Sequence, residues 1–275
     1  MIANLVIGSE GFIGKPFCKF LEERGEKVIH FDIIRDKKED GRFFKFNFKN
    51  IDKVYFLAWD VGGSKYLYEP KLQIFQLTWN LALMTNIFNQ LEKQRKTDFL
   101  FVSSSLSEET DTVYGSTKRL GEVWTTLLKG VSIRACNAYG VMQKQDIKSH
   151  VISDFIYQAL QTGKIQMLTN GEESRQFVYI KDLCSAFYMA FNSKNLKRNV
   201  YDAGSYEWVK IIDVAQIVSD LTGAKITPGK IKGHDPLPAE NMGRIPGWFP
   251  NVELKDGIKI MIEDAKEILK NDKKK

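Results

Sequence analysis

Short apolar runs rich in β-branched and aromatic residues alternate with longer segments of helical periodicity along the first half of the chain. The runs, which predict strands, lie at residues 2–7, 27–32, 43–48, 54–59, 98–104 and 131–136. Apolar residues recur at helical spacing just after residue 12 and over about 71–94 and 112–129. Strands separated by helices predict an α/β fold with a doubly wound parallel sheet, covered by helices on both faces.

The second half alternates less regularly. It predicts helices near 149–162, 181–192, 210–222 and 253–270, with short strands at 165–169, 175–180 and 199–204. Five of the seven prolines fall within residues 228–250, which indicates a linker or a binding loop. We therefore expect a first domain over residues 1–140 and a smaller α/β region over 141–275, with strand segments near 175–204 that could return to the first domain.

The composition is that of an ordinary globular protein. The 275 residues are 43% hydrophobic and 27% charged, and no uncharged apolar run approaches the roughly 18 residues that a membrane span needs. The chain opens on a strand-like run without the features of a secretory signal peptide. We therefore expect no contact with a membrane and a cytoplasmic location.

The cysteines, the histidines and the net charge indicate which metals and macromolecules the protein is expected to bind. Cys18, Cys136 and Cys184 lie far apart within apolar segments, which favours reduced core thiols, and the three histidines are equally dispersed, so we expect no metal. The net charge of +6 suits nucleic acid as well as a small anionic substrate. No basic patch is interleaved with aromatic residues, and we therefore expect no nucleic-acid partner.

The sequence IGSEGFIG, residues 7–14, places Gly8, Gly11 and Gly14 directly behind the first apolar run. A strand, a glycine-rich turn and a helix together form an anion site, because free backbone N–H groups and the positive end of the helix dipole point at the turn. Glycine permits the turn and lets a pyrophosphate approach the backbone. This context predicts a Rossmann-type dinucleotide site, with a purely structural turn as the alternative.

Asp32 ends the next predicted strand, 18 residues beyond Gly14. A carboxylate at this position accepts hydrogen bonds from the hydroxyls of an adenosine ribose and repels a 2′-phosphate, which favours NAD over NADP. Arg35, Lys37 and Lys38 follow closely and leave the alternative that a basic side chain turns toward a phosphate.

The segment VYGSTKRLGE places Tyr114 and Lys118 four residues apart, hence on one face of a predicted helix. A lysine ammonium stabilises a nearby phenolate, and a bound oxidised nicotinamide adds further positive charge. Such a tyrosine can act as a general base toward an alcohol near neutral pH. The pair follows a serine run, residues 103–105, at the end of a predicted strand.

With these motifs the sequence resembles the extended short-chain dehydrogenase/reductases, the NAD-dependent epimerase/dehydratase family that acts on nucleotide sugars. The resemblance covers almost the whole chain and rests on motifs in a fixed order. These are GSEGFIG, VYFLAW, LFVSSS, YGSTKRLGE, IRACNAYG, ESRQFVYIKDL and NVYDAGS. It implies a Rossmann-type NAD-binding domain over residues 1–140 and a mainly substrate-binding region over 141–275.

The resemblance also implies roles for individual residues. Tyr114 is the catalytic base, Lys118 is its partner and binds the nicotinamide ribose, and Ser105 or a neighbouring serine donates to the reacting oxygen. The implied NAD-binding residues are Gly8, Gly11, Phe12, Ile13, Gly14, Asp32, Asn47, Phe48, Leu57, Ala58 and Asn80, together with Tyr114 and Lys118. The implied substrate-binding residues are Asn137, His150 and Arg175. The arginine has a physical reason of its own, since its fork of donors suits a diphosphate.

Two features depart from the family pattern. Asn47 stands where an aspartate is usual, which affects the contact with adenine. Tyr114 follows Ser105 by only nine positions, whereas this connection is generally longer in related enzymes and covers part of the pocket. We therefore expect a more open site.

The resemblance implies that Tyr114 removes a proton from a sugar hydroxyl, which we predict to be at C4, while hydride passes to the nicotinamide. An epimerase then reduces the keto sugar on its other face, and a dehydrogenase releases it. A 4-keto-sugar reductase, with a GDP-linked sugar as one option, runs the reaction backwards. We predict an NAD-dependent nucleotide-sugar epimerase/dehydrogenase, with the reductase and a non-catalytic NAD-binding sensor as alternatives.

Dehydration and two-base epimerisation are disfavoured. Dehydratases of the family that this chain resembles carry Thr-Asp-Glu beside the strand end, where this chain has Ser-Leu-Ser at 105–107. Glu108 and Glu109 follow slightly later, and we expect them to be exposed loop charges. The segment SHVISDF resembles the histidine segment of GDP-fucose synthase and makes His150 a candidate acid, but the partner cysteine is missing.

Two further expectations concern surfaces. The resemblance implies a homodimer that forms through the long helices near 71–94 and 112–129. Arg244 and Trp248, in the proline-rich stretch, are expected to contact the sugar. The expected substrate is a nucleotide sugar.

Overall fold

The structure, a computed structural model, describes residues 3–94, 98–142, 145–193, 196–235 and 242–272. At its centre is a six-stranded parallel sheet in the order β10-β5-β4-β3-β1-β2. The strands are β1 (Ala3–Ile7), β2 (Val28–Phe31), β3 (Ile51–Phe56), β4 (Asp98–Ser104), β5 (Val131–Ala135) and β10 (Val200–Ala203). The predicted α/β fold with a parallel sheet is confirmed.

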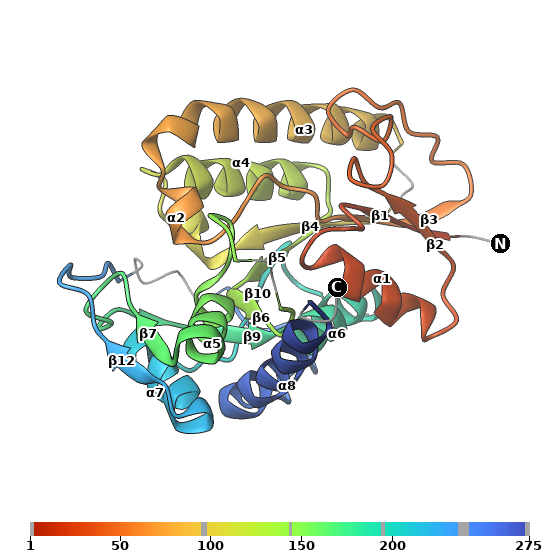
Figure 1. Cartoon of the computed structure of the whole chain (residues 1–275). Coiled ribbons are helices and arrows are strands. Elements are labelled where there is room, and N and C mark those ends of the chain that lie inside the picture. The colour runs from red at the N-terminus through yellow and green to blue at the C-terminus, as the bar shows by residue number, and fades with distance from the viewer. Residues whose placement is uncertain (1–2, 95–97, 143–144, 194–195, 236–241, 273–275) are drawn as a thin grey trace.

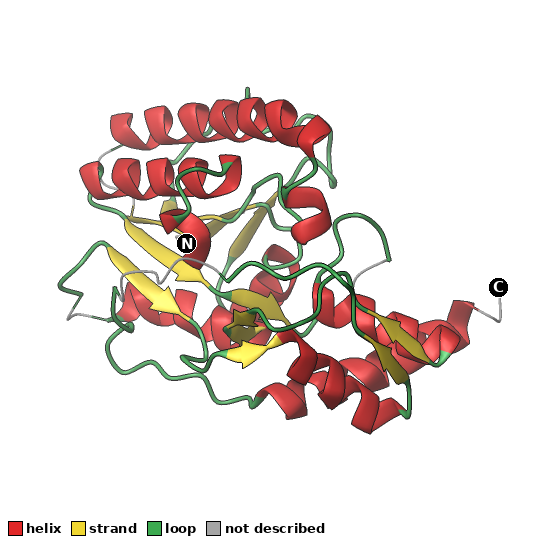
Figure 2. Cartoon of the chain, turned by 90° about the vertical axis from the view of Figure 1, so that its left-hand side faces the viewer, coloured by secondary structure: helices red, strands yellow, loops and turns green. Residues whose placement is uncertain are grey.

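Helices cover both faces of this sheet (Figure 1). Helices α3 (Gln73–Lys93) and α4 (Val113–Leu127) lie side by side on one face, and α1 (Gly14–Glu22) packs against α6 (Ile180–Asn192) on the other. Figure 2, turned by 90°, shows the same layer of two helices above the strands. The helices predicted near 71–94 and 112–129 are therefore confirmed, with ends that differ by one or two residues.

Alternation along β1 shows how the sequence fills both layers, since successive side chains of a strand point to opposite faces. Leu5 and Ile7 belong to an apolar cluster with Met84 and Phe88 of α3. Val6, between them, belongs to a second cluster that includes Phe17 of α1. The all-apolar run of the sequence is therefore that of a strand buried on both faces.

The strand predicted at 43–48 is wrong, because this segment pairs with none of the strands that the structure describes. The backbone groups of this segment form hydrogen bonds with side-chain amides of α3 instead. Gln90 accepts a hydrogen bond from the Phe46 amide at 2.8 Å and donates to the Phe44 carbonyl at 2.9 Å, and Asn86 also donates to that carbonyl at 2.9 Å. The alternating phenylalanines pack against the α3 side of the core rather than on a sheet.

A smaller α/β region lies beside the sheet (Figure 1). Its helices are α5 (Val151–Thr162), α7 (Ile211–Thr222) and α8 (Leu254–Asp272), which, together with α6, confirm the four helices predicted in the second half. Its strands form the pairs β6 (Asn137–Tyr139) with β9 (Phe177–Tyr179), β7 (Lys164–Gln166) with β12 (Lys225–Thr227), and β8 (Ser174–Arg175) with β11 (Val209–Lys210). Strand β10 follows β9 and α6 in the chain and pairs with β5 of the central sheet.

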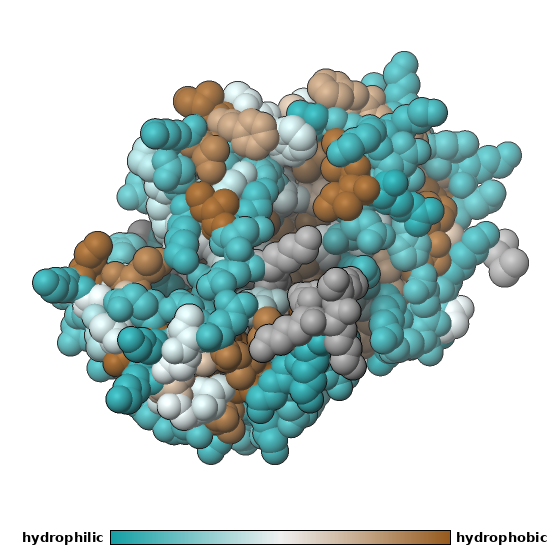
Figure 3. Space-filling model, viewed as in Figure 1, coloured by the Kyte–Doolittle hydropathy of each residue, from teal (hydrophilic) through white to brown (hydrophobic). Residues whose placement is uncertain are grey.

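The surface carries apolar side chains in small groups among hydrophilic ones on the face seen in Figure 3. In the part of the chain that the structure describes, no helix has the length and apolar character of a membrane span. Cys18, Cys136 and Cys184 are free thiols, as their spacing predicted.

Candidate active site

The glycine-rich turn after β1 packs so tightly that side chains are excluded. Gly8 has a φ of +95°, and a Cβ there would lie 2.5 Å from the amide nitrogen of Ala58. A Cβ on Gly14 would lie 1.8 Å from the Gly8 carbonyl oxygen. The amides of Leu57 and Ala58 both donate to the Ile7 carbonyl, at 2.9 and 2.8 Å, which joins the turn to the end of β3. The backbone at the start of α1 is thereby left without side chains that would block an anion.

This turn lies at the switch point of the sheet, because β1 pairs with β2 on one side and with β3 on the other. Asp32, directly after β2, is 7% exposed, and its two oxygens accept hydrogen bonds from the amides of Glu10 and Ile34 at 2.9 and 2.8 Å. Each oxygen keeps a lone pair for a ribose hydroxyl. Arg35 pairs with Glu39 at 4.0 Å, and the same Glu39 oxygen accepts from the Asp32 backbone amide at 2.8 Å. The turn and this carboxylate fit NAD.

Three other predicted cofactor residues support the site in different ways. Asn80 is 2% exposed; its amide oxygen accepts from the Asp60 backbone amide at 2.8 Å, and its nitrogen donates to the Asp60 carbonyl at 3.1 Å. It thereby fixes the loop after β3. Phe48 is buried in the core, whereas Asn47 is exposed and accepts from the Lys49 amide at 3.0 Å. Contact of Asn47 with adenine stays a prediction.

Tyr114 and Lys118 lie one turn apart on α4. The Lys118 ammonium lies 4.0 Å from the ring centroid of Trp59 and 5.9 Å from that of Tyr114, and donates to the Val102 carbonyl at 2.7 Å. Burial lowers the pKa of Lys118 well below its usual range. Burial also raises the pKa of Tyr114, and a hydrogen bond with the Ser104 side chain opposes this. The phenol therefore depends on nearby cationic charge to become a base.

The serine next to this phenol is Ser104, the last residue of β4. Its hydroxyl also accepts from the Leu106 amide at 3.1 Å. Ser105 begins the short 3-10 helix η2 (Ser105–Glu108), and its side chain instead forms a hydrogen bond with the thiol of Cys136. The chain turns directly after Ser104, so that Ser104 interacts with the Tyr114 phenol and Ser105 with the Cys136 thiol. Which of the two serines donates to the reacting oxygen stays a prediction.

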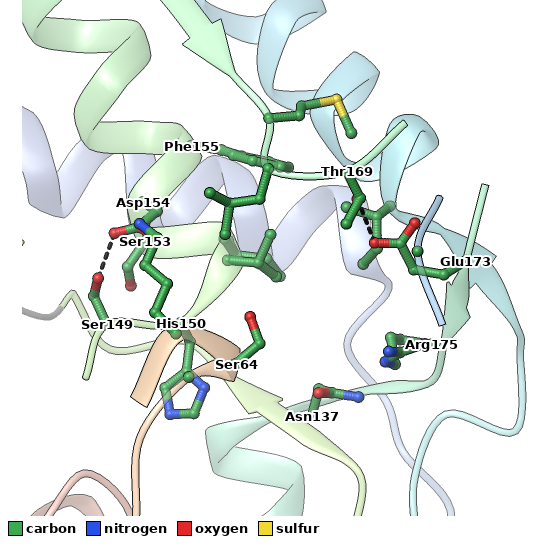
Figure 4. Close-up of a pocket in the computed structure, with 18 of the residues that line it drawn as sticks. Ser64, Asn137, Ser149, His150, Ser153, Asp154, Phe155, Thr169, Glu173 and Arg175 are labelled. Atoms are coloured by element: carbon green, nitrogen blue, oxygen red, sulfur yellow. Dashed lines mark hydrogen bonds and ion pairs between the residues drawn. The ribbon is translucent and has the colours of Figure 1, made fainter. Parts of the chain in front are cut away.

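A cavity of about 300 Å³ lies between the glycine turn and the smaller α/β region. Its wall contains all three predicted substrate-binding residues, Asn137, His150 and Arg175, and also Phe12 of the turn. In Figure 4, His150 lies on one side, and Asn137 and Arg175 lie between it and Glu173 on the other. Residues far apart in the sequence therefore meet around one space.

Arg175 of β8 presents a guanidinium that forms no ion pair with any described residue. It donates to the carbonyls of Ser174 and His234, at 2.8 Å each. Asn137 of β6 donates to the Gln176 carbonyl at 3.0 Å. A guanidinium has five N–H donors, so Arg175 keeps donors for an anion in the cavity.

The imidazole of His150 lies against Phe12, with ring centroids 5.2 Å apart. Burial lowers the pKa of His150, and Asp154 partly opposes this, so the ring is neutral near neutral pH. Asp154 itself forms an ion pair with Lys65 at 2.8 Å and accepts a hydrogen bond from the Ser149 hydroxyl. A neutral imidazole both donates and accepts hydrogen bonds, which suits a contact with substrate.

Glu108 and Glu109 are not the exposed loop charges that the sequence predicted. Glu109 is 4% exposed; the Tyr68 hydroxyl donates to it at 3.4 Å, and His234 lies 3.7 Å away. Glu108 lies 2.6 Å from the buried guanidinium of Arg134. The short connection to α4 causes both contacts, because it folds as η2 against the sheet instead of projecting from it. No local pattern could show this, since the partners are distant in the sequence.

Arg244 and Trp248 are absent from the described residues that line the cavity. Trp248 is 1% exposed, and its ring N–H donates to the Ser185 hydroxyl at 2.9 Å. The Arg244 guanidinium lies over the Tyr206 ring, 3.8 Å from its centroid. The predicted sugar contact is wrong for Trp248, which is a core residue.

Comparisons with known proteins agree with this site. The model of the NAD dependent epimerase/dehydratase family matches residues 4–204. A putative UDP-glucose 4-epimerase of Methanocaldococcus jannaschii is 26% identical over 94% of this chain and 96% of its own length. The dTDP-4-dehydro-6-deoxyglucose reductase of Escherichia coli is 24% identical over 95% and 97%. The structure of UDP-glucuronic acid 4-epimerase from Bacillus cereus, in complex with UDP-glucuronic acid and NAD, gives a TM-score of 0.76 at 21% identity over 97% and 100%.

The family match runs from the glycine turn through Tyr114 and Lys118 to the end of β10, and so covers most of the chain. It includes both the turn that fits NAD and the strand that carries Arg175. The chain therefore belongs to the NAD-dependent epimerase/dehydratase family, whose members are enzymes that use NAD as cofactor.

Proposed function

We propose that this enzyme is a nucleotide-sugar epimerase/dehydrogenase that oxidises a sugar hydroxyl at C4. The observation that carries the proposal is the pair of half-buried Tyr114 and buried Lys118 one turn apart on α4, with an interaction between the phenol and the Ser104 side chain. A sensor that only binds NAD needs no such constellation. The guanidinium of Arg175, which forms no ion pair with the described residues, lines the adjoining cavity and supports an anionic substrate such as a sugar diphosphate.

Each of these side chains has a role that follows from its position. The Lys118 ammonium stabilises Tyr114 as a phenolate, which accepts the proton of the sugar hydroxyl and becomes the neutral phenol. Ser104 donates a hydrogen bond to the reacting oxygen, and Arg175 holds the diphosphate. NAD, when bound at the glycine turn, supplies the hydride acceptor.

The proposal is tested with purified protein, NAD and a panel of UDP-, GDP-, dTDP- and CDP-sugars, with reduced nicotinamide followed by absorbance and the sugars by chromatography. A changed sugar without build-up of reduced cofactor identifies an epimerase, and build-up with one sugar identifies a dehydrogenase. Tyr114→Phe is expected to lower turnover by a factor of about 100 or more, as loss of a general base does, while NAD binding persists.

The matched control for this variant is Tyr188→Phe, which removes a hydroxyl from a tyrosine on α6 that packs against Phe20, outside the cavity wall. It is expected to keep full turnover. Tight NAD binding with no change of any sugar in the wild-type protein would contradict the proposal and favour the sensor.

We also propose that the enzyme is a homodimer through α3 and α4. Leu120, Val123 and Leu127 recur at helical spacing on α4 and are 44%, 48% and 76% exposed, and Ile74 and Phe75 of α3 are exposed as well. An apolar stripe of this kind is typical of an interface. Sedimentation should show a dimer for the wild-type chain and a monomer after Val123→Glu with Leu127→Glu; a monomeric wild-type chain contradicts the proposal.

A further inference from the structure

The ammonium of Lys118 lies against aromatic rings rather than against an anion. Lys118 is 4% exposed, and its Nζ lies 4.0 Å from the ring centroid of Trp59 and 5.0 Å from that of Phe101. The two rings contact each other, with centroids 5.5 Å apart and planes inclined at 63°. Nζ donates to the Val102 carbonyl at 2.7 Å and forms no ion pair with any described residue. The ammonium therefore depends on the ring faces for part of its stabilisation.

The anions around this lysine are engaged with other cations. Burial lowers the pKa of Lys118, and Glu122, one turn further along α4, opposes this only in part. The neighbouring carboxylates pair elsewhere: Glu122 of α4 and Glu108 of η2 with Arg134 of β5, and Asp60, next to Trp59, with Lys148. Helix α3 and strand β4 carry their charged side chains at exposed positions near their ends, 92–93 and 98. The titratable group that faces Lys118 on its own helix is Tyr114.

The backbone on either side of Trp59 is fixed. The Ala58 amide donates to the Ile7 carbonyl at 2.8 Å, and the Asp60 amide donates to the Asn80 side chain at 2.8 Å. These two bonds join the loop after β3 to β1 and to α3. They hold the indole in place against the ammonium.

The indole N–H of Trp59 is buried and has no hydrogen-bond partner among the described residues. A buried donor without an acceptor costs free energy, which a phenylalanine or a leucine at this place would avoid. Packing alone therefore does not account for a tryptophan here. The ring face does, because indole is the aromatic group that attracts a cation most strongly, and the attraction is larger where water is excluded.

We propose that Trp59 is a positioning residue, which keeps the Lys118 side chain as an ammonium beside Tyr114; this rests on the proposed function. Tyr114 needs that positive charge to be present as a phenolate. A ring that stabilises only the charged form of Lys118 therefore acts on the catalytic base through the lysine.

The test follows the ionisation of Lys118 in the NAD-loaded enzyme by NMR of isotope-labelled lysine side chains, with Lys118→Arg to assign the signal. Trp59→Leu is expected to lower the pKa of Lys118 by about one pH unit, which matches the strength of a desolvated cation–π contact. Turnover should fall by up to about tenfold, since less of the enzyme then holds a phenolate beside an ammonium. Trp59→Phe, which keeps a ring of weaker attraction, should lower the pKa by a smaller amount.

Fluorinated tryptophan separates the effect of the ring face from that of packing. Fluorine leaves the shape of the indole almost unchanged but withdraws negative charge from its face. The wild-type chain grown with fluorinated tryptophan should therefore show a lowered pKa of Lys118, and this measurement decides the matter if Trp59→Leu does not fold.

The matched control is Trp79→Leu. It removes a second half-buried tryptophan that has a cation over its ring, since the Arg42 guanidinium lies 3.4 Å from the Trp79 centroid. This variant should leave the pKa of Lys118 unchanged.

Any of three results overturns the inference: a pKa of Lys118 that Trp59→Leu leaves unchanged, one that fluorination leaves unchanged, or one that Trp79→Leu lowers as far as Trp59→Leu does. Each of them leaves the proposed function standing if Tyr114-dependent turnover occurs in the sugar panel. A pKa of Lys118 that responds to Trp59 in a protein that turns over no sugar contradicts the proposed function and, with it, the role of Trp59 in the reaction.

Discussion

Two buried carboxylates, one on α4 and one in the cavity wall, differ in how many hydrogen-bond partners they have. Glu122 on α4 is 2% exposed and accepts from Arg134 at 2.7 and 2.8 Å and from the Ser103 hydroxyl at 2.6 Å. Burial acts to raise the pKa of Glu122, but these hydrogen bonds hold it below its usual value. Glu173, nearly as buried, accepts one side-chain hydrogen bond among the described residues, from the Thr169 hydroxyl at 2.6 Å.

The difference lies in the number of partners. The pair of Glu122 and Arg134 joins α4 to β5, and α4 carries Tyr114 and Lys118. These hydrogen bonds fix the helix against the sheet, although Arg134 Nη1 is buried without a hydrogen-bond partner among the described residues. Glu173 Oε2 also lacks a partner among those residues, and it is buried against Gly233. Each of the following predictions changes one side of this comparison.

The largest effect is expected from Arg134→Met. It leaves Glu122 buried with Ser103 and the partly exposed Arg119, at 3.1 Å, as its remaining partners. Loss of one partner of a buried pair costs about 3–5 kcal/mol, which lowers the thermal midpoint by about 10 °C. Scanning calorimetry measures it. The double change with Glu122→Leu should recover much of the loss, and an unchanged midpoint for the single variant would show that the pair does not hold α4.

Asp202 on β10 gives an intermediate case, because it is the register partner of Arg134 but is bonded by the Met242 amide, at 2.7 Å. Burial raises the pKa of Asp202 to about 6. Since this lies above the ordinary value of 3.8, the fold favours the protonated form. Its stabilising contribution is complete below about pH 4 and is lost as the pH rises through about 6.

Asp202→Asn, which is neutral at every pH, is therefore expected to exceed the wild type in stability at neutral pH by up to about 2 kcal/mol. The advantage should shrink toward pH 4. Urea denaturation at several pH values measures it, and an advantage that does not change with pH contradicts the assignment.

The smallest effect on stability is expected from Glu173→Gln, at less than about 1 kcal/mol and in the stabilising direction, since it removes a charge that lacks donors. Scanning fluorimetry measures the thermal midpoint of the variant against that of the wild type. A fall in midpoint comparable with that of Arg134→Met would place Glu173 among the structural carboxylates.

Sequence reasoning predicted those parts of the site that local spacing controls. The three glycines, Asp32, and Tyr114 with Lys118 depend on a turn, a strand end and one helical turn, and each is where its spacing required. The choice between Ser104 and Ser105 depended instead on where β4 passes into η2. A shift of one residue at a strand end turns a side chain to the other face, and no signal in the sequence marked the transition.

What could not be predicted depends on contacts between distant segments. Glu109 is buried in contact with Tyr68 and His234, which are both distant in the sequence. The segment 43–48 forms no strand because its backbone hydrogen-bonds to side chains of α3. The burial of Glu173 Oε2 is of the same kind. It depends on the loop that contains Gly233, which lies about 60 residues further along the chain and packs against this oxygen.

The return of β10 to the edge of the central sheet has a consequence for how the enzyme is made. During synthesis, β5 emerges long before its partner, because the whole stretch from α5 to α6 lies between them. Until the ribosome has produced residue 203, the nascent cofactor half exposes an unpaired strand edge of the kind that promotes aggregation. Truncation after residue 140 would leave the edge of β5 that pairs with β10 exposed in the finished chain.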